Sequence, residues 1–376
     1  AWIDRDNADN LRTLDLRENG DLSSILPPEA LDTTDAQAIL AAYRRYRDAR
    51  AKDELRPLNE AKLLVVGNEA VGKTSLVRYL IHGEPRDKDE QATPRAAIHE
   101  KIDTHAWSPD GGGIQLNVWD FGGQEIMRGT HQFFLTRRSL YLIVLEDRRE
   151  DDRSVYEWLK TVRNRGGDSP VLVVVNKSEN DPPGLRLDET ALREEYPNIV
   201  GFLRTSCDPG DKPAAMIAAL RQAIAETVSE HLPHVRDEIP MPWLRVKEAV
   251  ADRARNESVL DMQDYIRLCE QSDEQGGPRN EPITDRNEQR SLLGILHDIG
   301  VVVAHGLDRE AHAAQREINL LDPNWLTGAI YGLITSKLVA DQDGELDRDQ
   351  INEILDPAEY PPHRHEFILD MMQDPK

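Results

Sequence analysis

One short stretch constrains this chain more than any other. Residues 67–74, GNEAVGKT, satisfy the pattern G-x-x-x-x-G-K-[ST], with a β-like run at 62–66 before them and a helical run at 75–81 after them. In that context the glycines let backbone N–H groups turn inward around phosphate oxygens, and the helix N-terminus adds a partial positive charge. We therefore expect a phosphate site in which Lys73 reaches the β- and γ-phosphates and Thr74 ligates Mg²⁺.

Around this loop, short apolar runs alternate with helical stretches from residue 61 to residue 231. Alternation of this kind favours an α/β domain with a mostly parallel, six-stranded sheet covered by helices. The glycines at 110–113 predict a hairpin turn and hence one antiparallel edge strand. The expected strands are 63–67, 98–107, 114–120, 140–146, 171–176 and 199–205, and the expected helices begin near Gly72, Asp151, Asp188 and Lys212.

Two further segments suit the chemistry of a magnesium–phosphate site. Asp120 ends the third expected strand, where a carboxylate can hold a magnesium-bound water, and Gly123 and Gln124 follow it. Gly123 leaves its N–H free to approach a γ-phosphate, and Gln124 is placed to orient an attacking water. Thr93 lies 20 residues after Lys73 in a polar stretch, and its hydroxyl would reach Mg²⁺ only when the γ-phosphate is present. A solvated loop position remains the alternative for Thr93.

The base is predicted by residues 176–179, NKSE, which follow a Val-rich strand. The guanine-specific form is N-K-x-D, in which the carboxylate accepts hydrogen bonds from N1–H and the 2-amino group. Glu179 replaces the Asp here, and a carboxylate at that place still rejects adenine, although its extra methylene must be absorbed by the backbone. Ser206 and Cys207, after the last strand, would supply a backbone N–H to guanine O6.

The flanks of this domain have a different pattern. Residues 11–19, LRTLDLREN, fit the core of one leucine-rich repeat, and a helix at 34–52 would cap such an array. A short amphipathic segment remains the alternative. After a Pro-punctuated linker at 233–242 the chain is mainly helical, with β-like pieces that favour a winged-helix-like module, and residues 363–365 are expected to be exposed. The helix candidates are 243–255, 259–271, 288–299, 323–336 and 347–355, and the β-like pieces are 301–304 and 317–321.

Charge excludes several classes of function. The formal charge is −23, from 46 Lys and Arg against 69 Asp and Glu, which argues against a general nucleic-acid binder or a protein of anionic membranes. No apolar run approaches the ~18–20 residues of a transmembrane helix. The two cysteines, Cys207 and Cys269, cannot form a disulfide framework, so we expect a reducing cytoplasm.

Taken in order, the phosphate, magnesium and base motifs resemble those of the Ras-like GTPase superfamily. Residues 119–127 (WDFGGQEIM) and 131–137 (HQFFLTR) resemble the switch II stretch of Roc domains, while 243–247 (WLRVK) and 321–326 (LDPNWL) resemble the COR domain of Roco proteins. The resemblance implies a leucine-rich-repeat end and linker at 1–58, a Roc domain at 59–232 and the first half of COR, COR-A, at 233–376.

The resemblance also implies a function: a GTP-hydrolysing switch that uses GTP, GDP and Mg²⁺, with its nucleotide state linked to conformation and dimerisation. We expect a homodimer in the full-length protein, with the dimerising half of COR beyond residue 376 and this chain itself monomeric. No kinase signature occurs in the sequence. A GTP-gated scaffold with negligible hydrolysis is the alternative, and a P-loop ATPase is disfavoured by Asn176 and Lys177.

Two residues bear on the rate of the expected reaction. Glu69 stands where many Ras-like proteins have Gly, and its charge near the γ-phosphate predicts slow intrinsic hydrolysis. Arg137 is a candidate donor of positive charge, with a surface Arg paired to a carboxylate as an equal alternative. The expected nucleotide-binding residues are Gly67, Asn68, Glu69, Ala70, Val71, Gly72, Lys73, Thr74, Ser75, Gly123, Asn176, Lys177, Glu179, Ser206 and Cys207; the expected catalytic residues are Gln124, Thr93 and Arg137; the expected metal-site residues are Thr74, Thr93 and, through water, Asp120.

Overall fold

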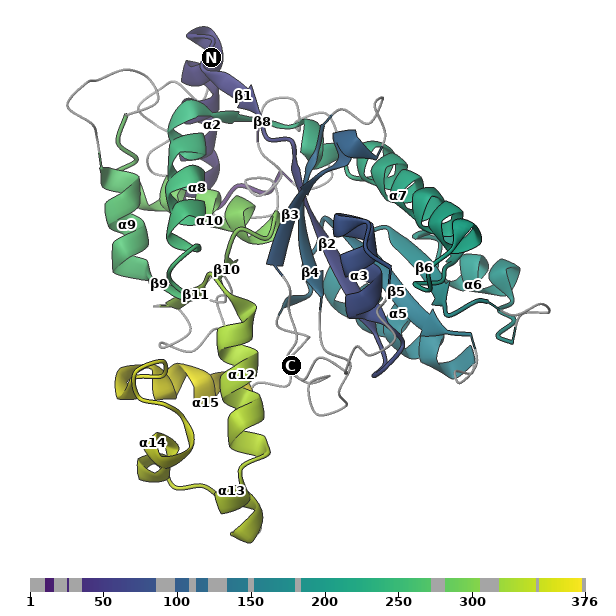
Figure 1. The fold of residues 1–376 in the computed structure, drawn as a ribbon. Coiled ribbons are helices and arrows are strands. Elements are labelled where there is room, and N and C mark those ends of the chain that lie inside the picture. The colour runs from purple at the N-terminus through teal and green to yellow at the C-terminus, as the bar shows by residue number, and fades with distance from the viewer. Residues whose placement is uncertain are drawn as a thin grey trace. The chain divides into compact units, whose positions relative to one another are not determined.

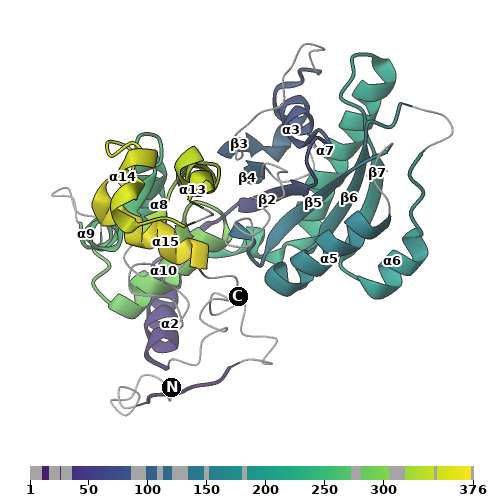
Figure 2. The same cartoon turned by 90° about the horizontal axis from the view of Figure 1, so that it is seen from below.

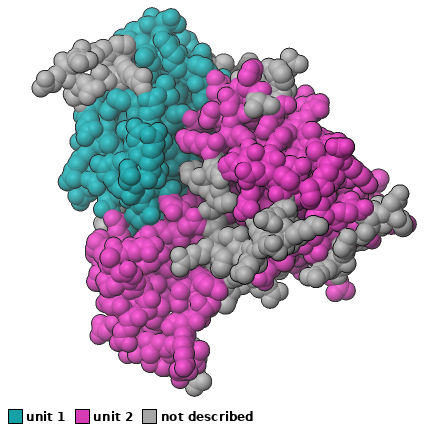
Figure 3. All heavy atoms as spheres, viewed as in Figure 1, with its two compact units in different colours: residues 1–58, 236–321 teal, residues 59–235, 322–376 magenta. Residues whose placement is uncertain are grey.

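The structure is a computed structural model in which the chain forms two compact units (Figure 3). Unit 1 comprises residues 1–58 and 236–321, and unit 2 comprises residues 59–235 and 322–376. The structure describes residues 11–16, 26, 36–85, 99–107, 113–120, 134–147, 152–179, 184–271, 281–304, 318–342 and 345–373.

A six-stranded sheet forms the centre of residues 59–235 (Figure 1). Its strand order is β3-β4-β2-β5-β6-β7; all neighbours are parallel except β3, which pairs with β4 in antiparallel fashion. The expected mostly parallel sheet with one antiparallel edge is therefore confirmed. The strands are β2 (Glu60–Gly67), β3 (His99–Asp103), β4 (Gln115–Asp120), β5 (Ser139–Glu146), β6 (Val171–Asn176) and β7 (Ile199–Arg204).

The expected strand at 98–107 is too long. It ends at Asp103, whose carboxylate accepts a hydrogen bond from the backbone N–H of His105, and Thr104–Ala106 form a 3₁₀ helix. Thr104 is buried there, and its hydroxyl accepts a hydrogen bond from the N–H of Ile114. A local side-chain cap thus ends the strand before its β-like pattern ends.

Helices cover both faces of this sheet. Figure 2 shows α3 (Lys73–His82) and α7 (Asp211–His231) over one face and α5 (Asp152–Gly166) over the other, with α6 (Glu189–Glu195) beside the sheet. Because successive side chains of a strand point to opposite faces, alternate residues such as Leu63 and Val65 of β2 join the core under α3 and α7. Burial on both faces is the reason that the central strands read as continuous apolar runs.

Among the residues of unit 1 that the structure describes, four α-helices accompany two small sheets. β9, β10 and β11 form a three-stranded sheet of order β10-β11-β9, and β1 pairs with β8 in a two-stranded sheet. The helix expected at 259–271 is wrong in its first turn, because Val259–Asp261 form β9 and pair with β11 before the helix begins. The elements are α2 (Ala36–Ala51), β1 (Leu55–Pro57), β8 (Glu238–Pro240), α8 (Met241–Arg253), β9 (Val259–Asp261), α9 (Met262–Glu270), α10 (Arg286–Asp298), β10 (Val303–Ala304) and β11 (Ile318–Leu320).

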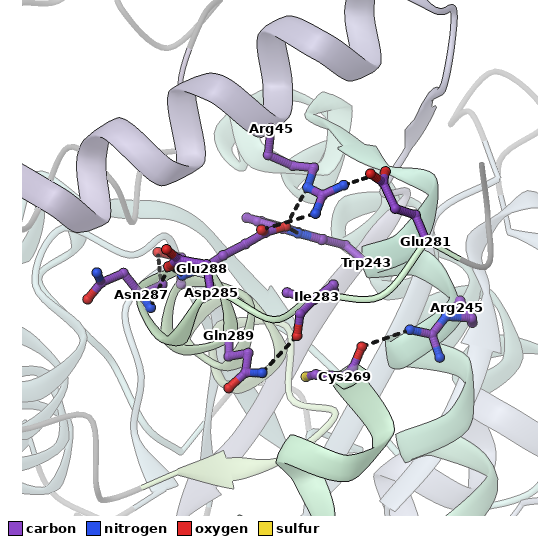
Figure 4. Close-up of polar contacts among 11 residues, drawn as sticks. Arg45, Trp243, Arg245, Cys269, Glu281, Ile283, Asp285, Asn287, Glu288 and Gln289 are labelled. Atoms are coloured by element: carbon purple, nitrogen blue, oxygen red, sulfur yellow. Dashed lines mark hydrogen bonds and ion pairs between the residues drawn. The ribbon is translucent and has the colours of Figure 1, made fainter. Parts of the chain in front are cut away.

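A buried polar network joins α2 to the later part of unit 1 (Figure 4). Arg45 of α2 places its Nε 2.7 Å from Glu288 Oε1 and its Nη1 2.6 Å from Glu281 Oε2. The indole N–H of Trp243 donates to the same Glu288 Oε1 at 2.7 Å, and the ring of Tyr46 meets Trp243 edge-on. Burial raises the pKa of Glu288, although Arg45 and Trp243 both oppose that shift. Helix α2 is therefore held to α8 and α10 by charge as well as by apolar contact.

The described part of the expected leucine-rich repeat lies against the same helix. Leu14 and Leu16 pack on a small buried cluster that includes Leu26, Ile39 and Ala42. The carbonyl of Leu11 accepts a hydrogen bond from the side chain of Gln37. These contacts fit a terminal repeat followed by a capping helix, which stays a prediction.

The described part of residues 322–373, which belongs to unit 2, is helical, with α12 (Pro323–Ile334), α13 (Lys337–Asp341), α14 (Ile351–Ile354) and α15 (His365–Gln373). Trp325 of α12 packs on Tyr360 and Phe367 and donates its indole N–H to the carbonyl of Glu359. His365, expected to be exposed, is buried and lies 2.8 Å from the carbonyl of Tyr360. Across the described residues, every helix is too short or too polar to span a bilayer.

Candidate functional site

The expected phosphate loop connects β2 to α3, and its backbone requires glycine at two places. Gly67 and Gly72 have φ angles of 152° and 90°. A Cβ on Gly67 would collide with the carbonyl oxygen of Val144, and a Cβ on Gly72 would lie 2.6 Å from Asn176 Nδ2. Positive φ and close approach of a neighbouring strand thus account for both glycines of the motif.

Lys73, the first residue of α3, folds back over this loop. Its buried ammonium donates to the carbonyl oxygens of Gly67 at 3.0 Å and Asn68 at 2.7 Å. Both acceptors belong to the loop itself, so the positive charge is held where phosphate oxygens would lie. The ammonium can exchange these neutral acceptors for anionic ones, which form stronger hydrogen bonds.

Thr74 and Asp120 meet beside the loop. The Thr74 hydroxyl donates to Asp120 Oδ2 at 2.6 Å, while Asp120 Oδ1, buried, has no hydrogen-bond partner among the described residues. Burial raises the pKa of Asp120 to about 6, with Lys73 and the Thr74 hydroxyl opposing the shift. A hydroxyl beside an unpaired carboxylate oxygen is the kind of hard oxygen donor set that Mg²⁺ prefers. The residues present therefore fit a magnesium ion.

The expected base motif begins at the end of β6 and is tied to the phosphate loop. Asn176 donates through Nδ2 to the carbonyl of Val71 at 2.9 Å and accepts through Oδ1 from the Thr205 hydroxyl at 3.1 Å. Lys177 Nζ lies 2.6 Å from the carbonyl of Ala70, which is also in the loop. One asparagine thus fixes the spacing between the phosphate loop and the two loops after β6 and β7.

Glu179 and Ser206 are brought together at the far side of this motif. The Ser206 hydroxyl donates to Glu179 Oε1 at 2.7 Å, and Ser206 and Cys207 are buried. The Sγ of Cys207 is 3.7 Å from Asn176 Oδ1. The longer side chain of Glu179 is therefore accommodated, with its carboxylate held by the loop expected to face guanine O6.

Other expected residues are placed differently. Gly123, Gln124 and Thr93 lie outside the described residues, Glu69 is exposed and Ser75 is half-buried. Arg137 is exposed and comes just before the amino end of β5, with its side chain near Gly167. Since β5 runs parallel to β2, and the phosphate loop follows the carboxyl end of β2, the structure places Arg137 at the opposite end of the sheet. It does not bring Arg137 to the loop.

Three supporting contacts could not be inferred from the motifs. Asn68 donates from Nδ2 to the Ser154 hydroxyl at 3.1 Å and accepts from the indole N–H of Trp158 at 3.2 Å, which holds the phosphate loop to α5. Asp147, after β5, pairs with Arg204 at 2.7 Å. Burial by itself would raise the pKa of Asp147, but Arg204 and two backbone N–H groups outweigh this effect, so the pKa is lowered. These contacts join segments that are far apart in the sequence, so no local pattern indicates them.

Comparison with known proteins agrees with this geometry. The family model described as "Ras of Complex, Roc, domain of DAPkinase" matches residues 62–179, and the one described as "C-terminal of Roc, COR-A domain" matches residues 240–376. Among solved structures, Roco2 RocCORdC of Methanosarcina barkeri bound to GDP has a TM-score of 0.71 and 34% identity, covering 85% of this chain and 92% of that one.

Curated relatives share the same region. A Roc-COR-CHAT protease of an unknown prokaryotic organism is 32% identical over 76% of this chain, and the probable serine/threonine-protein kinase pats1 of Dictyostelium discoideum is 25% identical over 83%. The chain spans 26% and 10% of these two proteins' lengths. Residues 62–179 form a Ras-like Roc domain with a mostly parallel sheet, and residues 240–376 match COR-A. This chain belongs to the Roco family of Roc–COR proteins.

Proposed function

We propose that this chain binds GTP and GDP with Mg²⁺ and hydrolyses GTP slowly, as the nucleotide switch of a larger Roco protein. The observation that supports this best is the convergence of the three loops on Asn176, which bonds both Val71 of the phosphate loop and Thr205 of the loop after β7. A GDP-bound structure of Methanosarcina barkeri Roco2, 34% identical to this chain, gives independent support.

In this proposal each residue has one task. Lys73 neutralises the β- and γ-phosphates, Thr74 holds Mg²⁺ directly and Asp120 through a water, and Gln124 orients the attacking water. When bound, the metal neutralises charge that develops on the phosphate oxygens. Glu179 accepts from guanine N1–H and the 2-amino group, where adenine would present an acceptor and no 2-amino group.

Nucleotide competition tests the assignment of the base. We expect GTP to displace a fluorescent GDP analogue at concentrations at least about 100-fold lower than ATP requires, because hydrogen bonds to a charged group contribute about 1.5–3 kcal/mol each. Glu179→Ala should remove most of this preference while leaving the weak ATP competition unchanged. Glu226→Ala, at an exposed position of α7, serves as the matched control. Equal competition by GTP and ATP in the unmodified chain would refute the assignment.

The second candidate is a GTP-gated scaffold with negligible hydrolysis, and Glu69 favours it. Glu69 is exposed within the phosphate loop, so its carboxylate adds negative charge beside bound phosphates. We expect Glu69→Gly to raise the single-turnover rate about tenfold above a basal rate on the order of 10⁻⁴ s⁻¹, the scale of unassisted Ras-type turnover. An unchanged or lower hydrolysis rate in Glu69→Gly would show that the Glu69 carboxylate is not what slows hydrolysis.

The remaining expectations belong to the same proposal. We infer a cytoplasmic protein whose full-length form is a homodimer linked to nucleotide state, with this chain monomeric. We also keep the limits 1–58, 59–232 and 233–376 for the repeat end, Roc and COR-A. Within unit 1, α2 packs on α10, where Arg45 donates to Glu288.

A further inference from the structure

A lysine lies inside the nucleotide-binding body with no exposed surface. Lys62 is the third residue of β2, five residues before Gly67, and its exposed fraction is 0%. Its Nζ donates to the carbonyl oxygen of Phe134 at 2.9 Å and to the Thr136 hydroxyl at 3.3 Å. The same Nζ lies 4.1 Å from the centroid of the Trp119 ring, in a cation–π contact.

These contacts join two points of the chain that are separated by residues 121–133. Trp119 directly precedes Asp120, the expected magnesium residue, and Phe134 directly follows residue 133. The rings of Trp119 and Phe134 also contact one another, with centroids 6.1 Å apart. The ammonium of Lys62 is therefore shared by both described flanks of the segment that includes Gln124.

The later flank is fixed to the sheet by two more hydrogen bonds. The hydroxyls of Thr136 and Ser139 are 2.8 Å apart, and the Tyr141 hydroxyl donates to the carbonyl of Thr136 at 2.7 Å. The strand register pairs Lys62 with Ser139 and Leu64 with Tyr141, so these side chains share the sheet face opposite the α3–α7 core. Lys62 is thus part of a buried polar cluster on one face of β2, β4 and β5.

Stability alone does not explain a cation in this place. Removing an ammonium from water costs several kcal/mol, and apolar residues of similar volume often replace buried charges without loss of stability. Lys62 lies on the strand that leads into the phosphate loop, so its contacts tie both described flanks of residues 121–133 to that strand. We propose that Lys62 is a positioning residue for GTP hydrolysis, an inference that rests on the proposed function.

The test uses Lys62→Met, which keeps an unbranched side chain, one heavy atom shorter, and removes its charge. We expect this variant to bind GDP within about threefold of the unmodified chain, while its single-turnover hydrolysis rate falls at least tenfold, because small misplacements of catalytic groups can cost about 100-fold. Amide exchange in residues 134–141 should accelerate, and exchange in residues 171–176 should not. If Lys62 only stabilised the fold, Lys62→Met would not slow hydrolysis while leaving GDP affinity unchanged.

Two further variants keep the test decisive. Lys101→Met makes the same change at an exposed position of β3 and should alter neither hydrolysis nor exchange at 134–141. If Lys62→Met does not fold, Thr136→Val replaces it: this variant removes one acceptor of the ammonium and should slow hydrolysis about threefold at unchanged GDP affinity.

The results that overturn the inference differ from those that overturn the proposed function. Hydrolysis in Lys62→Met within twofold of the unmodified chain would refute the positioning role. An absence of hydrolysis in the unmodified chain would refute the proposed function instead. In that case the exchange measurement still applies, and unchanged exchange at 134–141 would show that Lys62 does not anchor this flank.

Discussion

Lys73→Ala is expected to raise the dissociation constant for GDP at least about 100-fold. The Lys73 ammonium is buried against the loop carbonyls of Gly67 and Asn68, so its contacts with phosphate would be shielded from water. Two hydrogen bonds between charged groups contribute about 3 kcal/mol or more, and about 1.4 kcal/mol corresponds to a factor of ten. Titration of a fluorescent GDP analogue in the presence of Mg²⁺ measures the change.

The control for this prediction is Lys160→Ala on α5. Lys160 is exposed, so its removal should leave GDP affinity within about twofold. Thermal unfolding of both nucleotide-free variants checks that each of them is folded. A Lys73→Ala protein that is folded and binds GDP within threefold of the unmodified chain would show that the loop does not hold the phosphates as proposed.

Glu288→Ala is expected to lower the free energy of unfolding of unit 1 by about 3–5 kcal/mol, the usual result of removing one partner from a buried ion pair. The substitution leaves the Arg45 guanidinium and the Trp243 indole N–H without their shared acceptor at Oε1. Since the chain has two compact units, a single melting temperature would mix their transitions. Denaturant-dependent amide exchange in residues 36–51 and 286–298 reports on unit 1 directly.

Glu257→Ala provides the matched control, because Glu257 pairs with Arg253 on the surface at 3.4 Å and such pairs contribute at most about 0.5 kcal/mol. The double variant Arg45→Met with Glu288→Leu should regain part of the loss, since the only charge that it leaves without its partner here, Glu281, is exposed. A loss below 1 kcal/mol in Glu288→Ala would mean that the contacts of Glu288 contribute little to the packing of α2.

The sequence predicts the central strands well for a physical reason. β2, β5 and β6 are buried on both faces, so each is an apolar run that local pattern detects to within a few residues. The loop between β2 and α3 also follows from motif spacing. Lys62 is an exception: the β-like run at 62–66 includes it, but no local pattern predicts its burial, because lysine is normally exposed. Its acceptors come from Phe134 and Thr136, about 70 positions later, which no local window includes.

The flanking parts are less predictable because their elements depend on distant partners. β1 and β8 are three-residue strands that exist only because they pair with each other across the whole Roc domain. The residues of β9 fit the same apolar pattern as the helix that follows them. Their pairing with β11 makes them a strand instead of a first helical turn. His365 lies in a polar stretch, yet it is buried, with its Nε2 2.8 Å from the carbonyl oxygen of Tyr360. In each case tertiary contacts override the local pattern.

The pairing of β1 with β8 makes residues 59–235 an insertion within the sequence of unit 1. The N–H of Leu58 bonds the carbonyl of Asp237 at 2.8 Å, and the N–H of Asn59 bonds that of Val235 at 3.1 Å, so the inserted body begins and ends at one point. Closing so long a loop from an unfolded chain would cost on the order of 5 kcal/mol of chain entropy. When the insertion is folded, its ends are already adjacent, so pairing β1 with β8 requires no further loss of this chain entropy. Any ligand that keeps the insertion folded therefore also favours the packing of α2 on α10, through chain connectivity alone and without any contact between the two units.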